Sequence, residues 1–567
     1  MLLSLVVPFQ FLLPGYSWIR FSGLQRHFGI VETLVISFIL SVSFTSLFTA
    51  GLSLLTSHYL SYSVIGSLVL SLVPLIASLR RQSIPRNPRP KLNHELILVV
   101  AIASAYAAVL ASLLWSSPFY PTTDAFDPIT HAALVHAISS GLGRTTLLHS
   151  NYPLGLHFVA AVWVGLLDVN SLVAIRFLLS VVIVVSVFLT YFCARSILGS
   201  QYAILAVIAA TFVVPADAIH FIKIGTFPNI LSDVLVIATL WLIACYAKNP
   251  NHSLGLTLTF LAIAGMFVHS TFLIFLVALW LGLPVFLIYG RQFARDYLRG
   301  LLFATSGLLV LVVSLATFES ANLSRIFSDY VGGSFSSIPV LLYLQTLVWN
   351  YSVLAGPLAA FSIAIAVVFV LAKRRNLAWL VFLCVWFCLL MVAAVVSPQG
   401  WRFILLSMIP AGFLLAGAIG SLRELGSHST RPKLARMMRM IVPILLCVLI
   451  LSGGFVSLLP RVYDPSNRVR EGAVVDSMLW LKQNDQGLGV ASVGLSADYR
   501  YLTILTGIPY AGDFNYGANS TVAEARVGNF TYVAVAVQGS QFPTFGSSNL
   551  VEQKYRNSFV AIFFIAA

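Results

Sequence analysis

The sequence predicts an all-α polytopic membrane protein of about 13 transmembrane helices, followed by a small C-terminal α/β domain outside the cytoplasm. Hydrophobic residues make up 59% of the 567 residues, and charged residues only 9%. The mean hydropathy of +0.92 is far above that of soluble domains. Apolar runs long enough to cross a bilayer, about 20 residues each, recur along the chain as far as residue 459.

The first apolar stretch, residues 1–14, is short and interrupted by Pro8, and it fits an interfacial helix, an extra span or a signal-like segment equally well. The runs predicted as spans are residues 31–52, 59–79, 94–115, 171–193, 201–217, 227–247, 254–270, 272–290, 300–318, 350–372, 377–397, 403–422 and 440–459. The run 152–167 is too short for a comfortable span, so we expect a helix that lies in or dips into the outer interface.

Basic residues cluster in the short loops between these runs, and such loops stay in the cytoplasm. The clusters lie at residues 80–91, 291–299, 373–375 and 431–439. With alternating spans, one assignment places all of them inside, and this predicts a multi-pass plasma-membrane protein. The segments then placed outside are 116–170, 217–226, 319–349, 398–402 and everything after 460. Because the basic residues follow this pattern, the net charge of +14 does not indicate a nucleic-acid partner.

We divide the chain into a transmembrane domain, residues 1–460, and an extracytoplasmic α/β domain, residues 461–567. In the second domain a helix-like segment, 470–484, accompanies short apolar stretches. The stretches predicted as strands are 488–494, 532–537 and 559–567. About 105 residues suffice for a small domain with its own core. The five cysteines all fall inside apolar runs, so we expect neither a disulfide framework nor a thiolate metal site.

The outer loop 116–170 carries the strongest candidates for a functional site. Its stretch 117–157 contains the acids Asp124 and Asp127 and four histidines, in a chain with few charges. If residues 127–141 are helical, Asp127 and His131 lie one turn apart on the same face. This spacing suits a base with an orienting partner, or two ligands to one divalent cation. The alternative is that Asp127 only caps the helix and the histidines lie at the interface. For any single residue this alternative is favoured, but not for the whole cluster.

Two further outer segments carry charged residues. Asp217 and His220 are a candidate second acid and its neighbour, and Lys223 either meets a phosphate or snorkels to the interface. Arg402 lies at the outer end of a predicted span. Arginines are rare on that side under the positive-inside pattern, so a functional role is favoured. Because a guanidinium binds phosphate in bidentate fashion, Arg402 is a candidate phosphate-binding residue.

Together these residues resemble the GT-C superfamily of membrane glycosyltransferases, in particular its prokaryotic protein-mannosyltransferase, aminoarabinose-transferase and oligosaccharyltransferase group. Such enzymes carry an acid in the first long outer loop, then a helix of small residues that ends in glycine, then a Pro-rich stretch. Here Asp127 to His131, the segment 132–141 and the segment 152–157 follow that outline. Pro128 stands where several families have a second acid, and His131 where they have a tyrosine. We therefore leave the subfamily unassigned.

The resemblance implies a donor in which a polyprenyl phosphate or pyrophosphate carries the sugar, and transfer by direct displacement with inversion. Asp127, or failing that Asp124, would be the catalytic base on the acceptor. The residues implied to bind the substrate and its phosphate are Arg402, Lys223, His131, His157 and Tyr152. The α/β tail likewise resembles the soluble domains that follow the spans in many prokaryotic members.

The resemblance leaves the metal and the acceptor open. Oligosaccharyltransferases of the superfamily use a divalent metal, whereas several monosaccharide transferases do not. Asp127, Asp217 and His131 would supply ligands to magnesium or manganese, although their spacing does not demand an ion. The implied partners are a lipid-linked sugar donor and membrane lipids, with a protein, lipid or glycan as acceptor. Glycosylation in the cell envelope is the expected setting.

Two other functions remain open at this stage. A transporter or flippase for a lipid-linked or small polar substrate favours acids buried within spans and inverted repeats. Asp233 is one such acid, but the sequence contains no visible repeat. A non-catalytic scaffold would use the tail as its interaction module, but it leaves the loop 116–170 unexplained.

Overall fold

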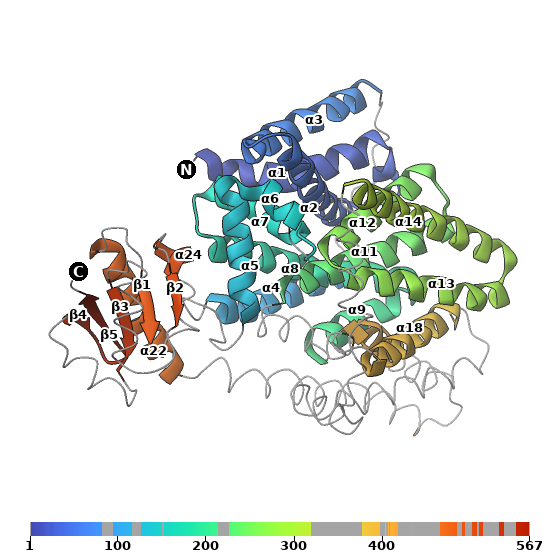
Figure 1. Ribbon diagram of the computed structural model, residues 1–567. Coiled ribbons are helices and arrows are strands. Elements are labelled where there is room, and N and C mark those ends of the chain that lie inside the picture. The colour runs from blue at the N-terminus through green and yellow to red at the C-terminus, as the bar shows by residue number, and fades with distance from the viewer. Residues whose placement is uncertain are drawn as a thin grey trace.

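The structure is a computed structural model of the chain. It describes residues 2–81, 94–115, 126–149, 152–213, 226–318, 377–396, 403, 406–407, 409–417, 433, 465–484, 490–493, 502–506, 508, 510–513, 532–537 and 551–565. Figure 1 shows a bundle of long helices with a small β-sheet beside it. The predicted combination of a helical membrane domain and a C-terminal α/β unit is therefore present in the described residues.

The N-terminal residues form a packed helix of the bundle. α1 (Leu2–Phe21) runs antiparallel to α2 (Ile30–Leu55) and also contacts α3 (Tyr59–Arg81). A Cβ atom at Gly15 would lie 2.1 Å from the Ser37 carbonyl oxygen, so only glycine allows α1 to approach α2 this closely. Residues 2–14, for which the sequence left three readings open, are thus part of a helix packed on α2 and α3.

Polar side chains meet along the interface of these three helices, and we call them the hydroxyl seam: Gln10, Ser41, Thr45, Thr49, Ser63 and Ser67. The Gln10 amide nitrogen donates to Thr45 Oγ1 at 3.3 Å, and its oxygen accepts from Ser67 Oγ at 2.8 Å. Thr49 and Ser63 share a hydrogen bond of 2.5 Å. Small polar residues of this kind let membrane helices pack closely and supply hydrogen bonds between them.

The helices that follow nearly coincide with the predicted apolar runs. They are α4 (His94–Trp115), α8 (Ser171–Ile197), α9 (Ser200–Ile208) with the π-turn η3 (Ala209–Val213), α11 (Phe227–Lys248), α12 (His252–Val268), α13 (Thr271–Tyr289), α14 (Arg291–Phe318) and α18 (Leu377–Val396). α14 begins well before residue 300, because its first turns are amphipathic and hydropathy alone misses them. There the buried Asp296 accepts a hydrogen bond from Gln292 Nε2 at 2.9 Å.

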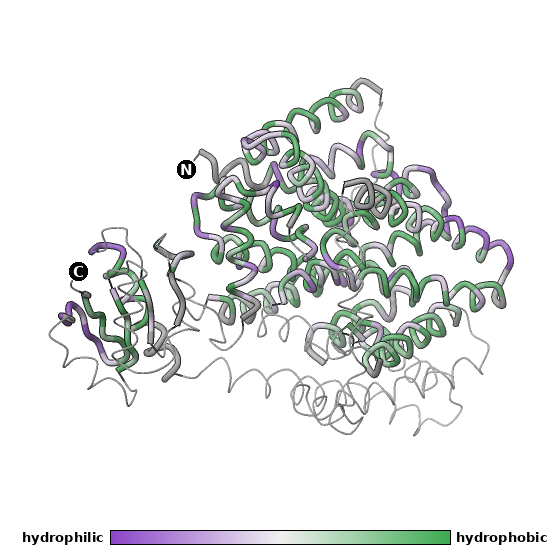
Figure 2. The backbone as a smooth tube through the Cα atoms, in the orientation of Figure 1, coloured by the Kyte–Doolittle hydropathy of each residue, from purple (hydrophilic) through white to green (hydrophobic). Residues whose placement is uncertain are grey.

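Among the described residues, four helices are long and apolar enough to cross a membrane by length and composition: Ile30–Leu55, Tyr59–Ser78, Ser171–Ile197 and Phe227–Lys248. The other apolar helices of that part of the chain are shorter. The count of about 13 spans therefore stays a prediction. Figure 2 shows hydrophobic residues along the helices and hydrophilic residues gathered at the turn between α13 and α14.

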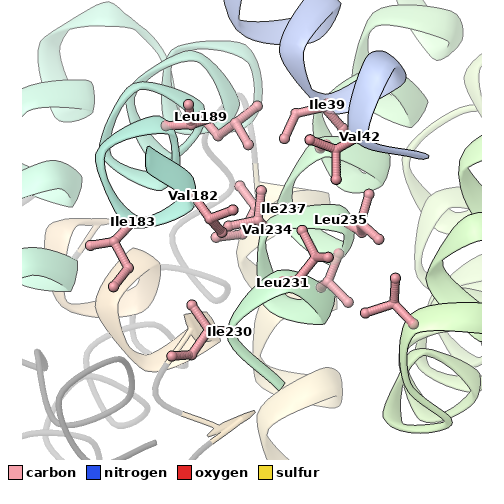
Figure 3. Close-up of a cluster of buried hydrophobic side chains, with 14 of the residues drawn as sticks. Ile39, Val42, Val182, Ile183, Leu189, Ile230, Leu231, Val234, Leu235 and Ile237 are labelled. Atoms are coloured by element: carbon pink, nitrogen blue, oxygen red, sulfur yellow. The ribbon is translucent and has the colours of Figure 1, made fainter. Parts of the chain in front are cut away.

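α11 is the central helix of the bundle, and nearly all of its residues are buried. Figure 3 shows part of the core, where α11 meets α2 and α8. Its labelled side chains are Ile39 and Val42 from α2, Val182, Ile183 and Leu189 from α8, and Ile230, Leu231, Val234, Leu235 and Ile237 from α11. Branched side chains predominate there, and close packing of this kind is what holds helices together in a lipid environment.

Four short elements lie between α4 and α8: α5 (Phe126–Ala137), the π-turn η2 (Ile138–Leu142), α6 (Gly143–His149) and α7 (Gly155–Leu167). The chain bends at Gly141, whose φ of 93° is in the left-handed region. Tyr59 holds this bend, since its hydroxyl donates to the Ile138 carbonyl and accepts from Gly143 N at 2.9 Å. α7 has 13 residues, too few to cross a bilayer, and most of them are buried against the bundle.

The two ends of the bundle differ. In Figure 1, α1, α3, α11 and α13 run across the view, and α5 stands upright at their left end. The sheet lies beyond α5, whereas the turn from α13 to α14, with Arg291, Arg295 and Arg299, lies at the right end. We call the first the α5 end and the second the basic end.

The C-terminal sheet has the strand order β2-β1-β3-β5-β4. Its elements are α22 (Pro465–Asn484), β1 (Val490–Val493), α24 (Leu502–Thr506), β2 (Tyr510–Asp513), β3 (Tyr532–Ala536), β4 (Val551–Arg556) and β5 (Val560–Ile565). β1 pairs parallel with β2 and β3, and β5 pairs antiparallel with β3 and β4. Buried residues of α22, β1, β3 and β5 give the unit its own core, and the predicted strands at 488–494, 532–537 and 559–567 are confirmed.

Candidate functional site

Five aromatic side chains from separate parts of the chain meet at the α5 end of the bundle, and we call them the histidine cluster. They are His131 from α5, Tyr152, His157 from the first turn of α7, Phe227 from the start of α11, and His269 from the link between α12 and α13. The Tyr152 ring centroid lies 5.5 Å from His131, 6.0 Å from His157 and 6.0 Å from His269. The His131 ring also lies 5.6 Å from Phe227.

Two of the histidines form a direct pair. Nδ1 of His131 lies 2.9 Å from Nε2 of His157, and both side chains are buried. Burial lowers the pKa of His157 to about 3, because the charged imidazolium would lose its water; the nearby Leu154 backbone acts more weakly in the opposite direction. His157 is therefore neutral at physiological pH, and one ring donates a hydrogen bond while the other accepts it.

The third histidine is held by the residue that starts α13. Nδ1 of His269 accepts from the Thr271 backbone N–H at 3.2 Å and lies 2.8 Å from Thr271 Oγ1. The Thr271 hydroxyl in turn lies 3.4 Å from Ser232 Oγ in α11. These contacts fix the orientation of the His269 ring beside Tyr152.

Polar residues continue from the cluster into α11 and its neighbour α8. Thr226, Asn229 and Asp233 follow one another along the first turns of α11, and all three are buried. Arg176 is buried in the second turn of α8, with its guanidinium carbon 5.8 Å from the centroid of the Trp115 ring. Buried ionisable residues are costly in membrane helices and usually mark functional sites.

Arg176, Asn229 and His269 are not among the site residues predicted from the sequence. A signal for Arg176 was present: an arginine shortly after the predicted outer start of a span violates the positive-inside pattern, as Arg402 does. Asn229 and His269 had no comparable signal, because their importance depends on which helices meet at this end.

The structure brings together three of the predicted site residues, His131, His157 and Tyr152. Asp127 belongs to the first turn of α5, one turn before His131 and thus on the same helix face, as expected; its side chain lies outside the described residues. The predicted residues that lie entirely outside the described part of the chain are Asp124, Asp217, His220, Lys223 and Arg402.

One segment with other candidates ends shortly before the histidine cluster in the sequence. Phe227 of the cluster is two residues after the end of the segment 214–225, which carries Asp217 and Lys223. Within the described residues, no group of three or more His, Cys, Asp or Glu side chains is arranged to hold a metal ion. Of the three predicted metal ligands, only the His131 side chain belongs to that part of the chain.

One protein-family model matches most of the chain. A family of unknown function (DUF6541) matches residues 9–409. No curated protein sequence matches the chain.

Solved structures show the fold. ArnT from Cupriavidus metallidurans bound to undecaprenyl phosphate aligns with a TM-score of 0.53 at 11% identity, over 84% of this chain and 98% of that one. Its apo form aligns with a TM-score of 0.52 at 13% identity, over 83% of this chain and 97% of that one. The oligosaccharyltransferase AglB from Archaeoglobus fulgidus, in complex with an inhibitory peptide and a dolichol-phosphate, aligns with a TM-score of 0.50 at 10% identity. The alignment covers 78% of this chain and 70% of that one. Both proteins are GT-C superfamily members, so the predicted resemblance to that fold is confirmed.

Proposed function

The chain belongs to the family of unknown function DUF6541 and has the fold of the GT-C glycosyltransferases, and we propose that it is an integral-membrane glycosyltransferase. It moves a sugar from a polyprenyl-phosphate-linked donor to an acceptor on the outer face of the membrane. The observation that carries this proposal is the histidine cluster. Its five side chains, from α5, α7, α11 and two connecting segments, meet one turn from Asp127, at the end opposite the basic turn. The undecaprenyl phosphate in ArnT and the dolichol-phosphate in AglB support the class of donor.

The topology follows from the two ends of the bundle. Positive-inside bias assigns the basic end to the cytoplasm, so the α5 end faces outward. The C-terminal sheet lies beyond the α5 end, which supports residues 461–567 as an extracytoplasmic domain.

In the proposed reaction Asp127, with Asp124 as the alternative, accepts the proton of the acceptor hydroxyl. The hydroxyl oxygen attacks the anomeric carbon from the face opposite the phosphate, and the bond from that carbon to the phosphate oxygen breaks. The products are the glycosylated acceptor, with inverted configuration, and the polyprenyl phosphate. Arg402 or Lys223 stabilises the negative charge that develops on the leaving phosphate. Asp217, three residues before His220 in the sequence, is the candidate second acid.

A divalent cation, if this reaction uses one, would take ligands from Asp127, Asp217 and His131 and would neutralise phosphate charge. Nδ1 of His131 is engaged with His157, so His131 would offer only Nε2 to an ion. No step of the mechanism above depends on a metal.

Comparing wild type with Asp127→Asn tests the proposal. The purified protein is given lipid-linked sugars extracted from the organism that makes it, and transfer or hydrolysis of the sugar is measured. We expect the variant to be at least about 100-fold slower, since a general base contributes on that order. Asp168→Asn is the matched control, because Asp168 is exposed at the end of α7 in a left-handed conformation that asparagine also adopts. Equal rates for wild type and Asp127→Asn would remove Asp127 as the base.

The same preparation separates the proposal from its main alternative. The buried Asp233 in α11 is the feature that a transporter or flippase would use. Substrate-dependent flux into liposomes, without transfer of any lipid-linked sugar, would replace the enzyme with a transporter.

A further inference from the structure

We propose that the start of α14 binds an anionic lipid of the membrane leaflet at the basic end. Its headgroup is bound by three arginines that we call the arginine stripe: Arg291, Arg295 and Arg299. Exposed apolar side chains that follow on the same helix face contact the acyl chains of that lipid. The inference does not depend on the proposed reaction, because it concerns the end of the bundle opposite the histidine cluster.

The spacing of the three arginines places them on one face of a helix. They stand four residues apart, which is close to one helical turn, so the stripe is about 12 Å long. All three side chains are exposed, and Figure 2 shows the hydrophilic residues gathered there. Only Gly290 separates α13 from α14, so the stripe belongs to a helix rather than to a loop.

The opposite face of the same turns is buried and anchors them. The Tyr297 hydroxyl donates to the Leu279 carbonyl at 2.7 Å. The centroid of the Tyr297 ring lies 4.3 Å from that of Phe286 in α13 and 6.2 Å from that of Trp379 in α18. Because these contacts hold the helix in place, a ligand of the stripe does not have to order the backbone that carries it.

One buried acid orients two of the arginines. Oδ1 of Asp296 lies 3.4 Å from Nη1 of Arg299 and 4.0 Å from Nε of Arg295. Gln292 links the groups, since its Nε2 donates to Asp296 Oδ2 at 2.9 Å and its Oε1 accepts from Arg295 Nη2 at 2.7 Å. A guanidinium has five N–H donors, so each arginine keeps donors for the oxygens of a phosphate.

The stripe presents positive charge to its surroundings although an acid lies within it. The side chains of Arg295 and Arg299 are 58% and 54% exposed, whereas that of Asp296 is only 9% exposed. The carboxylate therefore lies beneath the guanidinium groups, and the surface fits an anion.

The continuation of this helix face identifies the anion as a lipid. Leu302 lies three residues after Arg299, and Leu309 lies two turns further on, so both share the face of the stripe. They are 51% and 64% exposed and belong to the predicted span 300–318. A soluble anion would use the arginines alone. A phospholipid matches both parts of the face, with its phosphate against the arginines and its acyl chains against the leucines.

Lipid titrations of the purified full-length protein in detergent, followed by native mass spectrometry, measure the affinity. Phosphatidylglycerol is the anionic probe, and phosphatidylcholine, whose headgroup has no net charge, is the comparison. We expect one phosphatidylglycerol to bind more tightly than phosphatidylcholine. An arginine near an anionic surface contributes on the order of fivefold, so Arg295→Gln/Arg299→Gln should weaken phosphatidylglycerol binding about 25-fold and leave phosphatidylcholine binding unchanged. An unchanged preference for phosphatidylglycerol in this variant would overturn the proposal, with thermal unfolding as the check of its fold.

An exposed arginine elsewhere at the same end provides a control position. Arg26 lies in the turn between α1 and α2, and Nε2 of the next residue, His27, lies 3.4 Å from Nδ2 of Asn251, directly after α11 and its C-cap. The last turns of α11 approach the start of α14, since a Cβ atom at Gly300 would be 3.1 Å from the Tyr246 ring.

Two single variants then separate a site from a diffuse field. Arg291→Gln removes one charge from the stripe and should weaken phosphatidylglycerol binding about fivefold. Arg26→Gln removes the same charge outside the stripe and should leave the binding unchanged. Equal losses in the two variants would replace the site with general attraction to the basic end.

The probe without its acyl chains separates a lipid from a soluble anion. Glycerophosphoglycerol carries the same phosphate as phosphatidylglycerol but cannot contact Leu302 and Leu309. In excess, it should not displace the bound phosphatidylglycerol. Displacement would show a site for soluble phosphate esters and would overturn the assignment to a lipid. None of these measurements involves sugar transfer, so a failure of the proposed reaction leaves their outcome unaffected.

Discussion

The hydroxyl seam and the histidine cluster are two buried polar regions of one membrane protein, and they differ in kind. The seam joins α1, α2 and α3 through amide and hydroxyl groups that exchange hydrogen bonds among themselves. The cluster joins α5, α7, α11 and the α12–α13 link through imidazole rings. Buried polarity alone is therefore a poor guide to function.

The chemistry of the groups explains the difference. Hydroxyl and amide groups do not change charge near neutral pH, so the seam contributes close helix packing and little else. An imidazole has two distinct nitrogens and can exchange a proton, so its orientation and tautomer decide which groups it can bind or protonate. The cluster also lies at one end of the bundle, whereas the seam runs along the helices.

The largest expected effect separates activity from stability at His131. In His131→Asn the side-chain amide, which both donates and accepts, can keep a hydrogen bond with Nε2 of His157, but the ring nitrogen Nε2 of His131 is lost. We expect sugar transfer to fall about 100-fold, with a change in unfolding free energy below about 1 kcal/mol. Initial rates and thermal unfolding in detergent measure the two quantities.

The seam provides the opposite case. Gln10→Leu removes hydrogen bonds to Thr45 and Ser67, which should cost about 1 kcal/mol of stability and leave the transfer rate unchanged. If Gln10→Leu slows transfer as strongly as His131→Asn does, the functional distinction between the two regions is wrong.

Most of the helical fold was predictable, because crossing a bilayer imposes length and hydropathy on each helix. The run 94–115 is α4 to the residue, and 227–247 differs from α11 only at its end. The exceptions have physical causes. Hydropathy missed the first turns of α14, from Arg291, because they are amphipathic. It also did not indicate that α7 is buried against the bundle, because hydropathy does not separate lipid-facing from protein-facing residues.

The site was predictable in its residue types but not in its contacts. A helix at 127–141 was expected with Asp127 and His131 on one face, and α5 begins at Phe126. The pairing of His131 with His157, and the approach of His269 to Tyr152, depend on how α7 packs against α5 and α12. No local sequence pattern indicates these contacts. The side-chain positions of Asp127 and of the other acids and cations named from the sequence stay predictions.

A second prediction for the seam concerns how closely α1 packs against α2. Gly15→Ala would place a methyl group against the Ser37 carbonyl, and α1 must move away from α2 to accept it. We expect a loss of about 1–3 kcal/mol in unfolding free energy, as for other overpacked interfaces. Gly51→Ala in α2 is the matched control, because a Cβ there has no neighbour within 4 Å. Equal thermal stability of the two variants would show that α1 does not pack against α2 as described.

A pH dependence of the unfolding free energy distinguishes the cluster from the seam. The pKa of His157 is about 3 in the folded protein, against an ordinary value of 6.5, so below pH 6.5 the unfolded chain binds a proton that the folded chain does not. Its contribution to stability is complete above pH 6.5 and decreases by about 1.4 kcal/mol for each pH unit below it, down to about pH 3. Melting temperatures between pH 7.5 and 5 measure this slope. His157→Gln should flatten it, whereas Gln10→Leu, which removes no titrating group, should lower stability equally at every pH. A slope unchanged in His157→Gln would mean that the buried ring titrates as it does in water, and the neutral imidazole pair would then have to be abandoned.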